Sequence, residues 1–252
     1  MPVRTSRWAP LAAAAALTAV ACSPADAAPP PDAAPPPPVV VLDPGHNGGN
    51  ASAPTEIRRA VPDGRGGEKA CNTTGTSTDA GYPEHAFAFD VAGRVAARLE
   101  AAGVRVVLTR PDDHGVGPCV DERGRAGEPA GAAAVVSIHA DGAAHDASGF
   151  HVAYSDPPLS PAQAGPAHAL ATALRDALRR GGFPDSDYIG RDGLSPRADL
   201  AGLNHATRPT ALVECANMRN PDEAAVVSSP EGRERYAAAI ADGVLAFLDR
   251  NA

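Results

Sequence analysis

Aromatic residues, basic charge and long apolar stretches are all scarce in this sequence. Phe, Trp and Tyr make up 4% of the 252 residues, too few for the aromatic platforms on which single-stranded nucleic acids stack. Acidic residues outnumber basic ones by 30 to 22, and the net charge of −8 is the opposite of the basic face that nucleic-acid-binding proteins present. Past the N-terminal region, no apolar stretch is long enough to cross a membrane. The remaining composition, 44% hydrophobic and 21% charged, is that of a globular protein.

The N-terminal region has the layout of a secretory signal peptide. Arg4 and Arg7 give a charged start, and an apolar run of Ala, Leu and Val follows. Two processing sites compete: Cys22 ends a lipobox-like Ala-Val-Ala-Cys and would be lipidated, whereas residues 25–27 form an ordinary small-x-small cleavage site. Either outcome exports the mature protein. We therefore assign residues 1–27 to a signal peptide and expect the protein in the periplasm or cell wall, secreted or lipid-anchored.

A proline-rich segment separates this signal peptide from the rest of the chain. Residues 28–38 hold seven prolines, which predicts a semi-rigid, extended spacer because proline fixes φ and donates no hydrogen bond. Residues 39–252 have the length of one domain. We expect that domain to be monomeric.

Three cysteines follow Cys22, and an odd number in an oxidising compartment suggests one disulfide and one free thiol. Cys71 and Cys119 lie in loop-like sequence rich in Gly and Pro, whereas Cys215 ends an apolar, strand-like run. We therefore expect a Cys71–Cys119 bridge. The alternative is that both loop cysteines are unpaired.

Strands and helices alternate along the domain. Apolar runs predict strands at residues 39–42, 104–109, 133–138, 150–154 and 210–215. Helical periodicity predicts a helix that begins at Pro83 and closes at Gly103, and two more at residues 162–180 and 236–248. This alternation favours an α/β fold, a single-domain sandwich whose largely parallel, mixed central sheet is flanked by helices.

Polar side chains stand where three of these strands end. His46, His139 and Glu214 each follow a buried run, and the carboxyl edge of an open α/β sheet is where ligands bind. Glu84 begins the first long helix; taken alone, it would be a carboxylate that the helix dipole favours. Two histidines and a carboxylate are also a catalytic zinc set, and a further carboxylate near the metal is a candidate general base and acid.

Four motifs in order resemble one enzyme family. LDPGHNG, the Glu of PEHAFAFD, SIHAD and LVECANMRNPDE are similar to motifs of the zinc-dependent N-acetylmuramoyl-L-alanine amidases of bacterial cell walls. The resemblance implies one zinc ion per chain, held by His46, Glu84 and His139, with Glu214 as the catalytic carboxylate. It also implies hydrolysis of the amide between N-acetylmuramic acid and L-alanine, with peptidoglycan or its muropeptide fragments as substrate. Neither an organic cofactor nor a nucleic-acid partner is expected.

Residues near the last motif are candidates for substrate binding. The family more often has Gly-Phe and a Ser/Thr-Asn pair after the catalytic Glu, whereas this chain has Cys-Ala-Asn-Met-Arg-Asn. Asn217, Arg219 and Asn220 follow Glu214 closely, and His205 precedes the last strand; each is a candidate contact, with an ordinary loop role as the alternative.

The long segment between His46 and Glu84 shows neither helical nor strand periodicity. A loop of this length inside a compact domain is usually functional, and it leaves and returns at two proposed zinc ligands. We expect it to border the active-site groove.

Two other functions fit the same residues. A different envelope zinc hydrolase, such as a carboxypeptidase or a deacetylase, would release a different product. A non-catalytic wall-binding regulator would have lost a ligand or the general base, and this chain retains all four positions.

Overall fold

The computed structural model describes residues 1–3 and 36–250. The chain divides into two units, Met1–Pro36 and Pro37–Ala252, and the fold presented here is that of the second. Most of the predicted signal peptide, Cys22 and most of the proline-rich spacer lie outside the described residues. In the part of the chain that is described, no helix combines the length and the hydropathy that a membrane crossing requires.

The second unit is built on a six-stranded sheet and a separate two-stranded hairpin. In chain order the strands are β1 (Val39–Pro44), β2 (Ala60–Pro62), β3 (Glu68–Ala70), β4 (Arg105–Leu108), β5 (Ala134–Asp141), β6 (His151–Ser155), β7 (Leu194–Arg197) and β8 (Thr210–Asn217).

The main sheet has the order β4-β1-β5-β8-β6-β7. The pairs among β4, β1, β5 and β8 are parallel, β6 runs antiparallel to β8, and β7 is parallel to β6. The prediction of a largely parallel, mixed sheet in an α/β fold is confirmed. Because β1, β5 and β8 are parallel, their carboxyl ends meet at one edge of the sheet.

The helices vary widely in length. They are α1 (Pro54–Ile57), α2 (Glu84–Ala101), α3 (Val120–Arg125), α4 (Pro161–Ala164), α5 (Pro166–Arg180), α6 (Ala201–Asn204), α7 (Pro221–Ser228) and α8 (Pro230–Asp249), with a short 3-10 turn at Asn50–Ser52.

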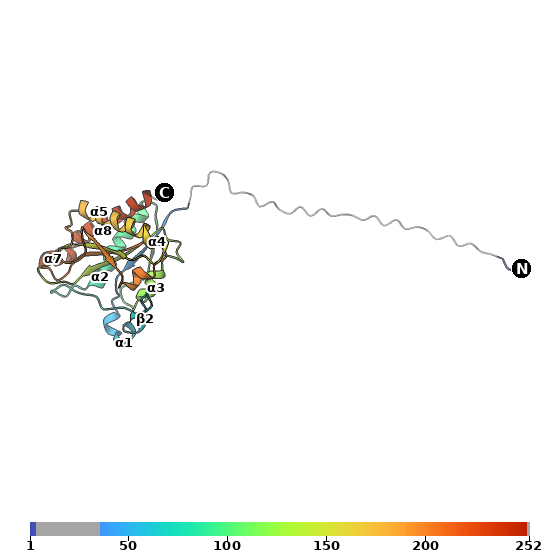
Figure 1. The fold of residues 1–252 in the computed structure, drawn as a ribbon, viewed down its shortest axis with the longest axis horizontal. Helices are drawn as coiled ribbons and strands as arrows, with labels where there is room; N and C mark the ends of the chain where they lie inside the picture. Colours follow the sequence, from blue (N-terminus) through green and yellow to red (C-terminus); the bar gives the residue numbers. More distant parts are fainter. Residues whose placement is uncertain (4–35, 251–252) are drawn as a thin grey trace. The chain divides into compact units, whose positions relative to one another are not determined.

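One face of the sheet carries the hydrophobic core. Alternate residues of β5, such as Val136 and Ile138, are fully buried against the three long helices α2, α5 and α8. Figure 1 shows α5 and α8 running side by side, with α1 and β2 at the far end of the unit from them. Burial of this continuous apolar face is the main force that holds the sheet to the helices.

Helix α2 follows the predicted pattern closely. Phe87, Val91, Val95 and Leu99 are all completely buried, as expected for residues that recur every four positions. Gly103 ends the helix with φ +82, a left-handed conformation that glycine adopts without steric cost. The amphipathic stripe therefore fixes the helix on the sheet and places its first residue at the sheet's carboxyl edge.

The prediction that the segment between His46 and α2 lacks secondary structure is wrong. This segment contains α1 and the antiparallel hairpin β2–β3. Each hairpin strand has three residues, too short to show a period of two. The turn is closed by Asp63, whose Oδ1 accepts hydrogen bonds from the backbone N–H groups of Arg65 and Gly67 at 2.7 and 2.9 Å.

Two helix boundaries also differ from the prediction. The helix expected at 162–180 is divided into α4 and α5 at Gly165, because Pro166 has no N–H to continue the ladder and its ring clashes with the preceding turn. Helix α8 begins earlier than expected, at Pro230, because the Ser229 side chain accepts a hydrogen bond from Gly232 N at 2.9 Å.

A disulfide joins Cys71 to Cys119, as predicted. It links the residue after β3 to the residue before α3, so it fastens the hairpin to the main unit. Cys215 is buried and free. The bridge closes a loop of 48 residues, and in the chain-entropy model such a cross-link stabilises the folded state by about 4 kcal/mol.

The first prediction concerns this bridge. Reduction should lower the melting temperature of the disulfide-bonded protein, because the unfolded chain regains the entropy that the cross-link removes. A Cys71→Ser/Cys119→Ser double variant should melt at a similarly lowered temperature and should not respond to reductant. Thermal denaturation followed by circular dichroism measures both. Equal melting temperatures with and without reductant in the unsubstituted protein would contradict the stabilising role.

Candidate active site

A cavity of about 480 Å³ lies against the other face of the sheet. Its floor is made by alternate residues of three parallel strands, which are Asp43 on β1; Ser137, His139 and Asp141 on β5; and Thr210, Leu212 and Glu214 on β8. The period of two explains this arrangement, since the residues between them face the helical core. The hairpin strand β3, helix α3 and helix α6 contribute the other walls.

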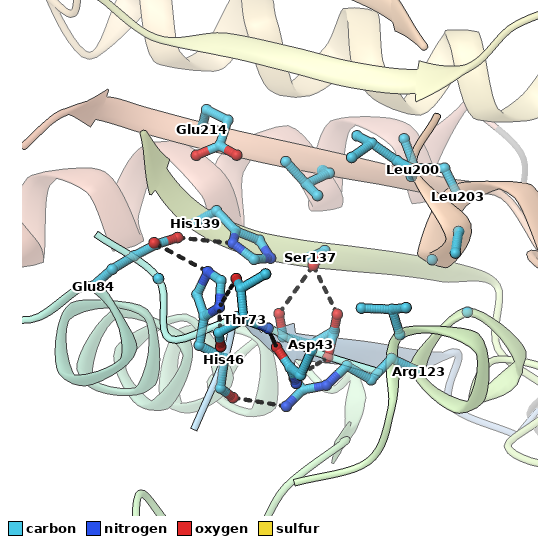
Figure 2. A pocket seen from close by; sticks show the side chains of 18 of the residues that line it. Asp43, His46, Thr73, Glu84, Arg123, Ser137, His139, Leu200, Leu203 and Glu214 are labelled. Atoms are coloured by element: carbon cyan, nitrogen blue, oxygen red, sulfur yellow. Dashed lines mark hydrogen bonds and ion pairs between the residues drawn. The ribbon is translucent and has the colours of Figure 1, made fainter. Parts of the chain in front are cut away.

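Three potential metal ligands meet at one end of this cavity. His46 Nε2 lies 3.0 Å from Glu84 Oε2, and His139 Nδ1 lies 2.8 Å from Glu84 Oε1. One ligand atom from each of the three residues lies within 4.8 Å of the others. Figure 2 shows the Glu84 carboxylate facing both imidazole rings, with a dashed line to each. The clustering that the motifs predicted is present.

The backbone at His46 turns sharply out of β1. Its φ of 57 is in the left-handed region that non-glycine residues rarely adopt, and such strain concentrates at functional sites. His46 Nδ1 lies 3.1 Å from Thr73 O and 3.2 Å from Thr73 Oγ1. Thr73 thus holds the imidazole ring so that Nε2 points toward Glu84.

The Glu84 carboxylate is 4% exposed, and four polar groups stabilise it. Besides the two imidazoles, the backbone N–H groups of Thr76 and Ala140 donate to it at 2.9 and 3.3 Å. Burial alone would raise its pKa, but the hydrogen bonds from His139 and His46 outweigh burial and hold the pKa well below its usual range. The site therefore presents an ionised carboxylate at neutral pH.

Glu214 stands beside this cluster in the sheet. It pairs in register with His139 on β5 and with His151 on β6. Figure 2 shows its side chain on the same side of the sheet as His139. Within the described residues, Glu214 Oε2 is buried and has no hydrogen-bond partner. Burial, with repulsion from Glu84 and Asp141, holds the pKa of Glu214 well above its ordinary value, so this carboxylate is a stronger base than a free one.

A second buried network lies further along the floor. Arg123 Nη1 donates to Asp43 Oδ1 at 2.8 Å, and Ser137 Oγ donates to Asp43 Oδ2 at 2.7 Å. Arg123 also donates to the carbonyl oxygens of Pro44 and His46 at 2.7 Å each. Burial would raise the pKa of Asp43, but Arg123 and the hydroxyl hydrogen bonds lower it overall. The network therefore fixes the turn that carries His46.

Comparisons with known proteins agree with this geometry. Residues 40–246 match the family model described as N-acetylmuramoyl-L-alanine amidase (Amidase_3). The chain belongs to the N-acetylmuramoyl-L-alanine amidase family. The resemblance of the four motifs to the N-acetylmuramoyl-L-alanine amidases is confirmed, and zinc dependence stays a prediction.

Individual relatives show the same likeness over most of the chain. The N-acetylmuramoyl-L-alanine amidase Rv3717 of Mycobacterium tuberculosis is 50% identical over 210 residues, which are 83% of this chain and 86% of that protein. The crystal structure of Ami1 from Mycobacterium smegmatis has a TM-score of 0.82 at 51% identity and covers 84% of this chain and 97% of its own. AmiC2 of Nostoc punctiforme has a TM-score of 0.64 at 28% identity, with 84% and 98% covered.

Two glycines allow the amidase cluster to be this compact. A Cβ on Gly45 would lie 2.3 Å from His139 Cε1, and a Cβ on Gly75 would lie 2.7 Å from Glu84 Oε2. Gly75 also has φ +76, which disfavours any other residue. The chain thus packs its backbone directly against the ligand side chains.

The predicted substrate-binding residues lie elsewhere. Asn217 is fully buried, and its side chain bonds the backbone of Ala143, Ala144 and Ala147. Asn220 caps α7 through Asp222 N and Glu223 N. Neither lines the main cavity, and substrate contact by them stays a prediction.

The other two candidates sit at the margin of the site. Arg219 pairs with Asp79 at 3.0 Å and lines a second, neighbouring pocket. His205 contacts the hairpin, since its Nε2 lies 3.0 Å from Pro62 O. Their contact with substrate likewise stays a prediction.

Sequence reasoning missed several residues of the floor. Ser137 lies two positions before the metal-site histidine of β5, and Asp43 lies two positions before the turn that follows β1. Because side chains alternate along a strand, this spacing was the signal that could have placed both residues on the cavity floor. His151 also lies beside the floor, where it is 1% exposed and pairs in register with Glu214. Burial lowers its pKa to about 4, so it is a neutral imidazole at physiological pH.

The second prediction tests the close approach at Gly45. A Gly45→Ala variant should lose at least about tenfold in metal affinity, because the new methyl group displaces the His139 ring. Metal content after dialysis against limiting zinc measures this. Gly93→Ala is the matched control, since a Cβ there meets nothing within 4 Å. Equal metal content in the two variants would show that the ring tolerates the methyl group.

The third prediction concerns the Asp43–Arg123 pair. Asp43→Asn should reduce the free energy of unfolding by about 3 kcal/mol at neutral pH, because it leaves a buried guanidinium without its charge partner. The folded-state pKa of Asp43 is lowered, so its stabilisation is full above about pH 4 and is lost as pH falls through the folded pKa. The difference between the two proteins should therefore shrink in acid.

Urea unfolding at several pH values measures this difference. Asp79→Asn is the control, because Asp79 pairs with Arg219 at the exposed surface and such pairs contribute less than about 1 kcal/mol. A loss at Asp43 no greater than that at Asp79 would contradict the prediction.

Proposed function

We propose that this chain hydrolyses the amide bond between N-acetylmuramic acid and L-alanine of the peptidoglycan stem peptide, with a zinc ion held by His46, Glu84 and His139. The observation that carries the proposal is the His–Glu–His cluster with a second buried carboxylate, Glu214, in register beside it. Membership of the amidase family supports the choice of the amide bond that is cleaved.

The residues present fit a zinc ion. Two imidazoles and one carboxylate are a donor set that zinc accepts, and three protein ligands leave a position for water or substrate. Gly45 and Gly75 form a cradle that a Cβ would fill. Thr73 supports His46 from behind, as second partners of zinc-bound histidines commonly do.

Each side chain has a distinct task in this mechanism. When bound, zinc supplies Lewis-acid polarisation of the scissile carbonyl and lowers the pKa of a water molecule. Glu214 accepts a proton from the attacking water and returns it to the departing nitrogen of L-alanine. Its raised pKa suits both halves of this exchange. Glu84 stays ionised and holds both imidazoles in place.

Export completes the proposal. The signal-peptide layout of residues 1–27 and the proline-rich spacer would place the domain outside the cytoplasm, where peptidoglycan lies. A lipid on Cys22 would retain it at the membrane surface, whereas cleavage after Ala27 would release it.

The fourth prediction separates the two carboxylates. Glu214→Gln should retain zinc but lose about 100-fold or more in turnover, because an amide cannot accept the proton. Glu84→Gln should lose zinc itself. Glu100→Gln, on the exposed end of α2, is the control and should keep both. Mass spectrometry of products from muramyl dipeptide and from intact wall, with zinc content measured in parallel, gives both readouts.

Three outcomes would count against the proposal. Full activity after chelation would exclude the zinc mechanism. Loss of zinc in Glu214→Gln, with catalysis regained on resupply, would exchange the two roles. A product with an intact lactyl–alanine bond would indicate a carboxypeptidase or a deacetylase.

A further inference from the structure

Lys69 is the only lysine in the 252-residue chain. It lies on β3 of the hairpin, is half-buried, and lines the same cavity as Glu84 and Glu214. The chain has 22 basic residues, and all of them except Lys69 are arginines. Lys69 is therefore the one basic residue whose charge is a compact ammonium on a flexible stem rather than a planar guanidinium.

The charges around the cavity are uneven. Four acidic residues line it, Asp43, Glu84, Asp141 and Glu214, against two cations, Arg123 and Lys69. Arg123 is 4% exposed, and its guanidinium is bound to Asp43 and to backbone carbonyls. Four of the five N–H groups of Arg123 are therefore used within the protein, and its charge is already paired with Asp43.

The Lys69 side chain makes far fewer hydrogen bonds than Arg123 does. Its Nζ donates one hydrogen bond, to Asp199 O at 2.6 Å, although an ammonium can donate three. The carboxylate of Asp199 is taken by Arg197, which donates to it twice, at 2.7 and 2.6 Å. Across residues 36–250 no ion pair joins Lys69 to a carboxylate. The cavity thus offers one available cation to an incoming anion.

The stem peptide supplies such an anion, an argument that rests on the proposed function. Beyond the scissile amide come L-alanine and then a D-glutamate linked through its γ-carboxyl, which leaves the α-carboxylate free. An extended dipeptide spans at most about 7 Å. Figure 2 shows Leu200 and Leu203 at the far end of the cavity from Glu84, so apolar surface is available to the alanine methyl group.

We propose that Lys69 binds the free α-carboxylate of the second stem residue and makes the site prefer a carboxylate over a carboxamide there. In a cavity with several acidic groups, a substrate carboxylate without this partner would be repelled. Lys69 is therefore a specificity-determining residue rather than a catalytic one.

Two probes isolate this one charge. Both are N-acetylmuramoyl-L-alanyl-γ-D-glutamyl-L-alaninamide; one keeps the α-carboxylate of the glutamyl residue, and the other carries a carboxamide in its place. Calorimetric Kd values are measured on zinc-loaded Glu214→Gln protein, so that binding is read without turnover. Hydrolysis of both probes by the unsubstituted protein, which retains Glu214, is measured separately.

The carboxylate probe should bind about tenfold or more tightly, as a charge-assisted hydrogen bond predicts. Lys69→Met should abolish this preference, mainly by weakening the carboxylate probe, and Lys69→Arg should keep part of it. Added salt should reduce the preference for the carboxylate probe in the protein that retains Lys69, and should have no such effect in Lys69→Met. Arg105→Met removes one exposed charge on β4, outside the cavity, and should leave the preference unchanged.

Several results would overturn the proposal. Equal binding of the two probes, or no binding of either, would show that the carboxylate is not recognised. Equal weakening of both probes by Lys69→Met would indicate that the Lys69–Asp199 contact merely holds the hairpin. A preference that Lys69→Met leaves intact would point to another cation. Charge-dependent binding without cleavage at the lactyl–alanine bond would refute the proposed function but support carboxylate recognition by Lys69. Cleavage without a charge preference would support the proposed function and refute the role of Lys69.

Discussion

A buried carboxylate between two imidazoles is the constraint on which the rest of the structure depends. Glu84 is removed from water at the start of α2, and such a charge is tolerated only when its oxygens are fully bonded. His46 after β1, His139 on β5 and the backbone of Thr76 and Ala140 supply those bonds. Two strands, a helix and a long loop must therefore converge within a few ångströms, and the glycines at the contact points are a consequence of that convergence.

The sheet extends this local constraint to the whole cavity. A strand shows alternate residues to each face, so the register that brings His139 beside Glu214 also brings Ser137 beside Asp43. The same strands give their other residues to the helical core. A one-residue slip of β5 would expose the core residues and bury the ligands, which is why packing of the apolar face and geometry of the polar face are fixed together.

Those parts of the molecule that follow from periodicity could be predicted from the sequence. Helix α2, the strands at the carboxyl edge and the convergence of His46, Glu84 and His139 all rest on long patterns or on position at a strand end. The hairpin β2–β3 and the strand β7 are too short to show a pattern, and their positions are decided by tertiary contacts such as Asn204 Nδ2 donating to Asp63 O at 2.9 Å. The side chains of Asn217 and Asn220 serve loop closure and helix capping, roles that their position after Glu214 did not reveal.

The hairpin also bears on which part of a wall polymer this cavity can hold. It crosses from the disulfide beside α3 to Asn204 on α6, where Arg65 Nε donates to Asn204 Oδ1 at 3.0 Å, and its strand β3 forms a cavity wall. A glycan strand continues in both directions and needs an open groove, whereas a stem peptide has one end attached and can enter a walled cavity from that side. A volume near 480 Å³ suits a few residues of peptide. Under the proposed reaction the sugar therefore stays outside, near the metal ligands, and the peptide occupies the space in which Lys69 is the available cation.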